Sequence, residues 1–447
     1  MKRYINLSLI FLLIAGLSSS CGNTKKTVEQ QSLFTAPSGT ELETAPVKTK
    51  EFPYYIPQKE PSNLKLSKSM KRLYEYWQGT RPEENELFTN FKYTRLQGFD
   101  YHNGDGTVTR RDATRIIKYK GLYYVYYTKR DTPTGHMGNA HCTETIPGWD
   151  WDLCDIWCAT SKDGFTWHEK GVAVRRPKAP TIGFRTVCTP EILVWKGKFY
   201  IYFQAYTKMS TKGDDCCVSV AYSDDPGKEF TKLNKPVIVN GTKDEWDGYT
   251  IHDPTPVVFK NKIYLYYKSD YNDRNEDKSN YKKLRSIGLA TSDDPLKVFT
   301  KSPYNPVMSS GHECGVFRYE DGICLVVARD GHEHNTIQFS KDGINFDIRS
   351  IVTMMPVSFA AYDPDAFTNT MDARGISWGI CHNAHVKTKG VPYSHHTELL
   401  RFDCDLSKDV YNFNMKDPDP KYTIDELCRQ GLTKEEKAAI MKRNTLK

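Results

Sequence analysis

The sequence lacks an apolar run long enough to cross a membrane, because the stretch from Ile5 to Leu17 falls short of the about 20 residues that a spanning helix needs. It also lacks a basic run suited to nucleic acid: the net charge of +7 over 447 residues collects mostly near the two ends. The cysteines and histidines between His136 and Cys158 match no standard zinc-ligand spacing. These absences argue against a membrane-spanning protein, a nucleic-acid partner and a bound zinc ion.

The first residues have the pattern of a cleaved export signal. Lys2 and Arg3 precede the apolar stretch, and small residues lead up to Cys21. Small residues directly before a cysteine resemble a bacterial lipobox, with Ser18 where a larger aliphatic residue is usual. We therefore expect residues 1–20 to be a lipoprotein signal peptide and Cys21 to carry the lipid. The protein would then be exported to the periplasm or cell surface, touching the membrane only through this lipid anchor.

The segment that follows is predicted to be a flexible tether over residues 21–63. It is rich in Thr, Lys, Glu, Pro and Ser and has no hydrophobic periodicity. Export favours disulfides, and eleven of the twelve cysteines remain after Cys21. Because eleven is an odd number, at least one of these cysteines is expected to be free or to pair between chains.

A repeat organises the next 300 or so residues. Five times, an extended aromatic or β-branched segment, a Gly or Asn turn and a second extended segment follow one another, the hairpin signature. These copies begin at Arg115, Glu191, Thr255, Gly315 and Ala366. At four of the five sites a Ser-Lys/Asp-Asp-Gly/Pro turn before an aromatic comes next. The fixed order predicts an all-β, five-bladed β-propeller over residues 91–405, whereas a long β-sandwich would not explain it.

Short helices are expected on both sides of the propeller. In the predicted N-terminal helical arm, residues 64–90, the apolar positions Met70, Leu73, Tyr74 and Trp77 fall at helical spacing. In the predicted C-terminal tail, residues 406–447, Thr423 and Thr433 are suited to cap one or two helices.

Acidic residues recur where each innermost strand would begin, so they should converge on the central channel. They are Asp112, Glu191, Asp253, the pair His312–Glu313, and Asp363. Gathering carboxylates costs repulsion and desolvation, and it separates their pKa values into an acid and a base. Glycoside hydrolysis needs this division of roles. Trp149 and Trp151, in the loop before the second motif, are predicted to stack on a sugar face, with packing between blades as the alternative.

Several motifs together resemble glycoside hydrolase family 117. They are GDGTVTRRDATRII (from Gly104), WDWDLCDIWCATSKDGFTW (from Trp149), IHDP, GHE and the arm sequence SKSMKR. The resemblance runs from about Ser67 to about Asp403 and implies an exo-acting, inverting 3,6-anhydro-α-L-galactosidase that acts on agar-derived neoagaro-oligosaccharides. It also implies a homodimer formed by exchange of the arm, whose SxAxxR motif has Ser69 in place of Ala here.

The resemblance assigns roles by position. Asp112 is similar to the general base, Asp253 to a second essential aspartate, and His312–Glu313 to the pair that supplies the acid. We expect Arg110 and Arg111 to hold Asp112 ionised. Asp100 and Asp105 remain alternatives for the base. Between the two candidate acids we favour His312, with Glu313 binding substrate or tuning the imidazole. Glu191, Asp363, Trp149 and Trp151 are predicted to bind substrate.

Other functions stay open at this point. The same carboxylate scheme suits the related propeller families 43, 32 and 62, and hence a family 43-like glycosidase on another plant or algal polysaccharide. A non-catalytic glycan-binding propeller and a metal-dependent lyase or oxidase are further alternatives. No cofactor is required by the predicted chemistry, although a structural divalent cation in the channel is compatible with it.

Overall fold

The structure is a computed structural model that describes residues 59–75, 85–209, 216–242, 245–248, 250–269, 285–388, 395–417 and 435. The chain divides into two units, Met1–Glu43 and Thr44–Lys447, and every described residue belongs to the second. The predicted signal peptide, Cys21, nearly all of the tether and the helices predicted after Thr423 lie outside the described residues, although Glu435 is helical. None of the described helices is long and apolar enough to cross a membrane.

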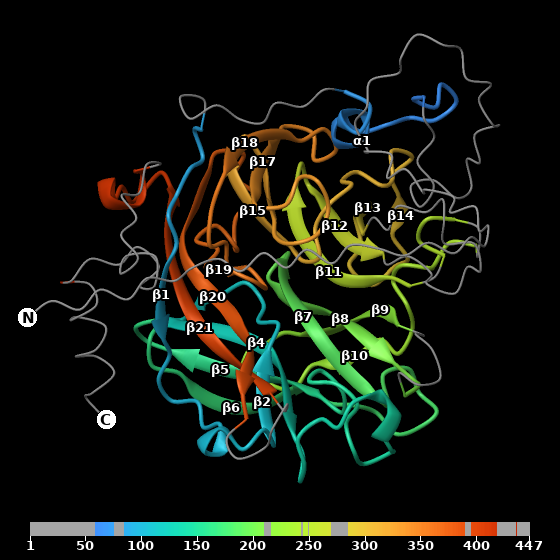
Figure 1. The fold of residues 1–447 in the computed structure, drawn as a ribbon, viewed down its shortest axis with the longest axis vertical. Helices are drawn as coiled ribbons and strands as arrows, with labels where there is room; N and C mark the ends of the chain where they lie inside the picture. Colours follow the sequence, from blue (N-terminus) through green and yellow to red (C-terminus); the bar gives the residue numbers. More distant parts are fainter. Residues whose placement is uncertain are drawn as a thin grey trace, which may run out of the picture. The chain divides into compact units, whose positions relative to one another are not determined.

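The described residues are almost entirely β-structure, which confirms the predicted all-β class (Figure 1). Their antiparallel pairings form five sheet units, called blades I to V here. Blade I contains β2 (Val108–Arg111), β3 (Ile117–Tyr119), β4 (Leu122–Asp131), β5 (Asp155–Ser161) and β6 (His168–Val174). Blade II contains β7 (Thr186–Trp195), β8 (Lys198–Tyr206), β9 (Cys217–Ser223) and β10 (Thr231–Lys232). Blade III contains β11 (His252–Phe259), β12 (Lys262–Ser269), β13 (Ser286–Ser292) and β14 (Thr300–Lys301). Blade IV contains β15 (Cys314–Glu320), β16 (Gly322–Val327), β17 (Thr336–Ser340) and β18 (Asp347–Ile351). Blade V contains β19 (Ala360–Ala361), β20 (Ala373–Lys387), β21 (His395–Ser407) and, from the N-terminal side of the chain, β1 (Lys92–Arg95).

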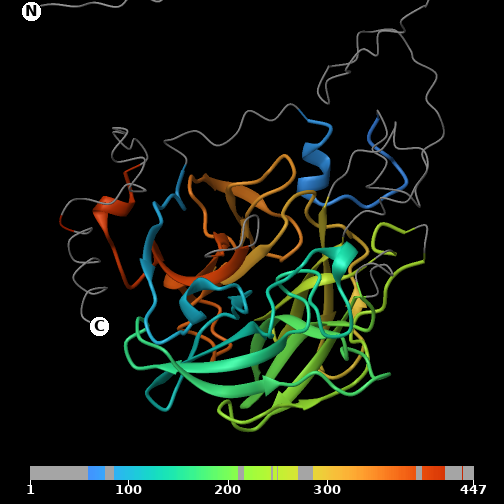
Figure 2. The same cartoon turned by 60° about the horizontal axis from the view of Figure 1, so that its bottom comes forward.

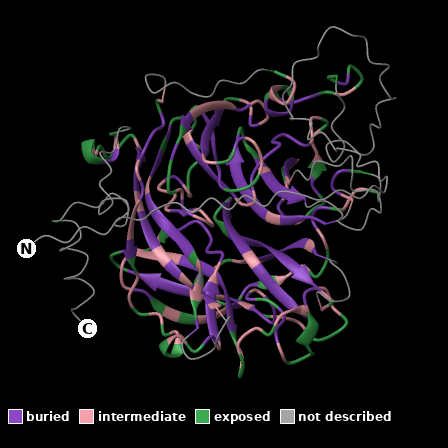
Figure 3. Ribbon diagram, in the orientation of Figure 1, coloured by how far each residue is buried: buried purple, intermediate pink, exposed green. Residues whose placement is uncertain are grey.

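The recurring Gly or Asn turns form tight hairpins. Two residues separate β3 from β4, β7 from β8 and β11 from β12, and both residues of each pair adopt positive φ angles. The pairs are Lys120–Gly121 (47° and 81°), Lys196–Gly197 (49° and 79°) and Lys260–Asn261 (48° and 58°). Such a turn matches the right-handed twist of the strands that it joins. The middle strands are buried along most of their length because neighbouring blades cover both faces (Figure 3).

Strands of neighbouring blades contact one another around a closed ring. β4 contacts β7, β7 contacts β11, β11 contacts β15, and β15 contacts β20, while β20 and β21 contact β2. β1 pairs with β21, with Lys92 opposite Asp403 and Arg95 opposite Leu400, so a strand from the start of the fold completes the last blade (Figure 2). The blades therefore leave a central channel into which the start of each inner strand opens.

The predicted helical arm contains α1 (Lys68–Arg72), and the described 3₁₀ turns are η2 (His102–Gly104), η3 (Asn139–His141) and η5 (Phe413–Met415). α1 begins at Ser67, whose hydroxyl accepts a hydrogen bond from the Met70 amide. The arm packs on blades III and IV of its own chain, since Ser67 Oγ donates to the Val307 carbonyl (2.8 Å) and Lys68 pairs with Asp347. Exchange of the arm between two subunits stays a prediction.

Eight of the described cysteines, namely Cys142, Cys154, Cys158, Cys188, Cys314, Cys324, Cys381 and Cys404, form no disulfide, which differs from the disulfides expected for an exported protein. All of these eight except Cys142 are buried. Cys158, Cys324, Cys381 and Cys404 belong to hydrophobic clusters within or between blades, where an unpaired cysteine packs as a small apolar side chain.

Candidate active site

In each of three blades, a residue with a left-handed backbone conformation lies at the mouth of the channel. Asp112, Thr189 and Asp253 have φ angles of 48°, 46° and 49°, and a register shift follows or includes this position in blades II and III. A non-glycine residue rarely adopts such a φ, and a bulge re-aims the side chain that carries it. All three residues line one small cavity of about 40 Å³, together with Glu191 and Glu313. This volume holds roughly three water molecules.

Asp112 is buried and held by two basic groups. Arg111 Nε lies 2.8 Å from Asp112 Oδ2, and His382 Nδ1 lies 3.2 Å from Oδ1. Burial opposes ionisation, but Arg111 and His382 together hold the pKa of Asp112 well below its usual range. Asp112 is therefore an ionised carboxylate at neutral pH, as a group that activates water must be.

Arg110 does not contribute to this pair, contrary to the expectation from sequence. Consecutive side chains of β2 point to opposite faces, so Arg110 turns away from the channel. Its guanidinium pairs with Glu169 (3.0 Å) and lies over the rings of Phe99 and Tyr101. Only Arg111 of the two arginines therefore contacts Asp112.

Asp253 has a separate set of partners on blades II and III. Lys268 Nζ lies 2.6 Å from its Oδ2, and Gln204 Nε2 donates to its Oδ1 (3.1 Å). Gln204 and Lys268 occupy the same position of the second strand in blades II and III. The repeat therefore places two polar side chains beside Asp253.

Glu313 and His312 have different partners, and both lie in the bend that precedes β15 rather than in a strand. Glu313 lines the cavity, accepts a hydrogen bond from the Ser358 amide (2.7 Å) and contacts Arg329 (3.3 Å). Burial favours its neutral form and Asp112 adds repulsion, but His382, Arg329 and His312 hold the pKa of Glu313 below its usual range. Glu313 is therefore ionised beside Asp112.

His312 forms an Asp–His pair with Asp330. Its Nδ1 lies 2.8 Å from Asp330 Oδ2, and Arg285 contacts both members of the pair. Burial lowers the pKa of His312, and Lys268 lowers it further. The lowered pKa favours the neutral imidazole, so His312 must take up a proton before it can donate one, and His312 is not among the residues that line the cavity of Asp112.

Glu191 and Asp363 share a single arginine rather than an open binding surface. Arg115 donates from its backbone amide (2.9 Å) and from Nε (3.1 Å) to Glu191, and its other end lies 3.6 Å from Asp363. Burial raises the pKa of Glu191 despite this arginine. Glu191 lines the cavity that contains Asp112, whereas Asp363 lines a different, smaller space of about 10 Å³.

The two predicted stacking tryptophans differ in their surroundings. Trp149 is 41% exposed, whereas Trp151 stacks on Tyr206 (ring centroids 4.9 Å apart). The Tyr206 hydroxyl lies 3.1 Å from His252, the residue before Asp253. Neither tryptophan lines the cavity of the acidic residues.

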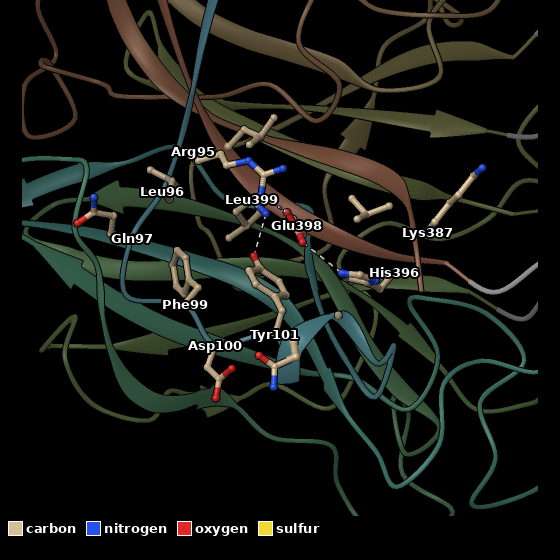
Figure 4. A pocket seen from close by; sticks show the side chains of 14 residues that line it. Arg95, Leu96, Gln97, Phe99, Asp100, Tyr101, Lys387, His396, Glu398 and Leu399 are labelled. Carbon is tan, nitrogen blue, oxygen red and sulfur yellow. Dashed lines mark hydrogen bonds and ion pairs between the residues drawn. The ribbon is translucent and has the colours of Figure 1, made fainter. Parts of the chain in front are cut away.

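The alternative bases lie elsewhere. Asp100 lines a larger hollow of about 550 Å³ beside Tyr101, His396 and Glu398 (Figure 4). Asp105 accepts hydrogen bonds from the amide and hydroxyl of Thr107 in an exposed turn. Neither lines the cavity that holds Asp112.

Asp112, Glu313 and His382 present oxygen and nitrogen atoms that all lie within 4.8 Å of one another. Such a trio could hold a divalent cation. The same spacing also bears on acid–base roles, because an inverting glycosidase separates its two carboxyl groups by about 6.5–9.5 Å. The nearest carboxylate oxygens of Asp112 and Glu313 are closer together than this separation.

The sequence did not point to several residues that complete the site. His382 contacts Asp112 from blade V, 270 positions away along the chain. Asp150, in the tryptophan loop, is buried and lies 4.0 Å from Arg111 and 3.4 Å from Arg130. Asp150 stands between two tryptophans in the sequence, which suggested that this loop stacks on a sugar. Its carboxylate instead lies beside Arg111, the arginine that pairs with Asp112.

Comparison with known proteins agrees with this geometry. Residues 150–390 match the family model described as glycosyl hydrolases family 43. The solved structure of Zg3597, a family 117 glycoside hydrolase of the marine bacterium Zobellia galactanivorans, is 47% identical to this chain. It covers 78% of this chain and 100% of its own, with a TM-score of 0.71. This protein belongs to glycoside hydrolase family 117. The resemblance noted from sequence motifs is thereby confirmed, and the activity class of this family member is hydrolysis of glycosidic bonds.

A more distant solved structure, a complex of BT0996 with RGII in its description, is 14% identical and has a TM-score of 0.50 over 76% of this sequence and 97% of its own. It supports the fold alone. No curated protein sequence matches this family 117 member.

Proposed function

We propose that this family 117 member is an exo-acting, inverting 3,6-anhydro-α-L-galactosidase that removes the terminal anhydrogalactose of agar-derived neoagaro-oligosaccharides. The observation that carries the proposal is the partly open cavity of about 40 Å³, where Asp112, Asp253 and Glu313 from three blades lie together. A space of this size suits the reacting end of one terminal sugar. The substrate class follows from the family resemblance.

The roles of the residues follow from their charges. Asp112, held ionised by Arg111, is the base that activates water. His312, oriented by Asp330, donates the proton to the leaving oxygen. Glu313 stays ionised and binds the sugar, since it lies too near Asp112 to serve as its acid partner. Asp253, with Lys268 and Gln204, binds the terminal sugar from the third blade.

Water attack on one face and protonation on the other gives inversion at the anomeric carbon. This proposal requires no cofactor. It gives the three residues Asp112, Glu313 and His382 the roles of base, sugar-binding group and partner of Asp112, with a cation in the channel as a structural addition only.

Product analysis tests the proposal. The protein is incubated with neoagarobiose and with other red-algal, xylan and arabinan oligosaccharides, and the first product is followed by proton NMR at the anomeric position. We expect anhydrogalactose to appear with inverted configuration from the neoagaro series alone. Asp112→Asn is the matched inactive control, because Asn tolerates a left-handed φ and so preserves the backbone.

Release of xylose or arabinose would instead support the family 43-like alternative. Saturable binding of glycans with no product from the wild type would support a non-catalytic propeller.

A further inference from the structure

The arm lies directly behind the segment that carries the proposed acid. Ser69 Oγ donates to Glu333 Oε2 (2.9 Å) and accepts a hydrogen bond from the Ser309 amide (3.2 Å). Arg72 contacts Glu333 through two nitrogens (2.5 and 3.0 Å) and donates to Gln338 (3.0 Å). Ser69, Ser309 and Glu333 are all buried. The arm therefore binds two segments at once, the one before His312 and the one after Asp330.

These two segments are hydrogen-bonded to each other between the arm and the site. The Glu333 amide donates to Ser310 Oγ (3.0 Å), and the Gly311 amide donates to the Asp330 carbonyl (2.9 Å). The His312 amide donates to the Arg329 carbonyl (3.0 Å). The side chains of His312 and Asp330 then meet at 2.8 Å. A continuous series of contacts thus runs from Arg72 to the imidazole.

The chemistry of Glu333 makes this series sensitive to the arm. A buried carboxylate is stable only when it is paired and hydrogen-bonded, and Arg72 is the cation that pairs with Glu333. Without the arm, the Glu333 carboxylate loses its cation and must be hydrated instead. We expect the segment after Asp330 to move so that water can reach this carboxylate. His312 lies three positions beyond Ser309, and Asp330 three positions before Glu333, so a shift at either contact reaches the pair.

We propose that the arm is a positioning element for the proton donor: through Glu333 and Ser309, Arg72 and Ser69 hold the His312–Asp330 pair in register. The inference rests on the proposed function for its kinetic consequence. Arg72, Ser69 and Glu333 are positioning residues, because they act through His312 and line no part of the cavity. The same contacts can be made by the arm of this chain or by that of a second copy.

The test compares Arg72→Ala with Lys68→Ala in the full-length protein. Lys68 lies on the same helix but pairs with Asp347 at the surface, so its loss should disturb nothing near the site. Each variant is assayed on neoagarobiose and on an aryl anhydrogalactoside whose leaving group needs no protonation. General acid catalysis contributes about 10²–10⁴-fold. We expect Arg72→Ala to lower kcat on neoagarobiose by at least about tenfold while the aryl glycoside is hydrolysed near the wild-type rate, and Lys68→Ala to match the wild type on both.

Glu333→Gln protects the test against simple unfolding, since Arg72→Ala leaves a buried carboxylate unpaired whereas the amide keeps the shape of Glu333 and one acceptor oxygen without a charge. It should show the same dependence on the leaving group. Hydrogen exchange gives a readout that needs no substrate: both variants should accelerate exchange at the amides of Gly311 and His312, and Lys68→Ala should not.

Equal losses on the two substrates, or unchanged exchange at these amides in both variants, would overturn the proposal. If the wild type hydrolyses neither substrate, the proposed function fails, and hydrogen exchange alone then decides whether the arm positions the pair.

Discussion

At the scale of single residues, the same unusual backbone conformation occurs at three residues of the site. Asp112, Thr189 and Asp253 each adopt a left-handed φ where an inner strand begins. Such a conformation costs about 1 kcal/mol or more and persists only where the surrounding structure enforces it. Here the surrounding blade holds each residue in this conformation, and the conformation points its side chain toward the channel. Blade II uses Thr189, whose hydroxyl lies 3.3 Å from Asp112 Oδ2.

The acid can be identified at the same scale. With His312→Ala, turnover of neoagarobiose should fall by about 10²–10⁴-fold, the usual contribution of a general acid, because no group replaces the proton donor. An activated aryl glycoside should restore most of that loss. Glu313→Gln should reduce turnover of both substrates, since an ionised residue that binds the sugar is needed whatever leaves. Steady-state kinetics of the two variants on the two substrates measures this. If the aryl glycoside rescues Glu313→Gln and not His312→Ala, Glu313 is the acid.

Sequence reasoning found the acidic residues and missed most of their partners. Asp112, Asp253 and Glu313 could be predicted because they recur at one point of a repeat. His382 could not, because blade V is the most degenerate copy and its contact with Asp112 depends on ring closure. The assignment of Arg110 was wrong because the alternation within β2 decides which neighbour faces the channel.

At the scale of elements, a tyrosine in the middle of β4, β8 and β12 joins each of three blades to the next one. Tyr126 donates to the Pro226 carbonyl (2.7 Å), Tyr202 to Pro295 (3.0 Å) and Tyr266 to Gly343 (2.8 Å). Each acceptor lies in the Ser-x-Asp turn of the following blade. In that turn the serine and aspartate side chains bind backbone amides, as Ser340 and Asp342 do. The two motifs that recur in the sequence are thus the two halves of one contact between blades.

We predict that Tyr202→Phe lowers the free energy of unfolding by about 1 kcal/mol, because it leaves the buried Pro295 carbonyl without its donor. Urea unfolding followed by fluorescence measures the change. Tyr222→Phe is the control, since no hydrogen bond of its hydroxyl is present among the described residues. An equal effect of the two substitutions would mean that the tyrosine contributes by packing alone.

Blade V contains a strand pairing that the sequence repeat does not predict. Its outer strand, β1, precedes every copy of the repeat and pairs with β21 about 300 residues later. Four residues of β1 carry too little pattern to predict this pairing from sequence. The number of blades could be counted from the hairpins, whereas the closure of the ring depends on a long-range contact that the hairpins do not encode.

At the scale of the whole molecule, the arm bears both on the fold of one chain and on the predicted assembly of two chains. Nine residues, 76–84, separate the described part of the arm from the residues that lead into β1. A segment of this length spans at most about 30 Å. In the single chain, Ser69 and Arg72 both contact Glu333, between the second and third strands of blade IV. Exchange of an identical element is a common route to a symmetric dimer, and it costs no new surface.

We predict that the mature protein is a dimer and that deletion of the residues before Gln78 makes it a monomer in multi-angle light scattering. An isolated helix as short as α1 is marginal in water, so the arm is stable only when docked. Lys68→Ala, which keeps the contacts of Arg72, should remain dimeric and serves as the control. A truncated protein that stays dimeric would show that another surface holds the subunits together. A full-length protein that is monomeric at every concentration would mean that the arm docks only on its own chain.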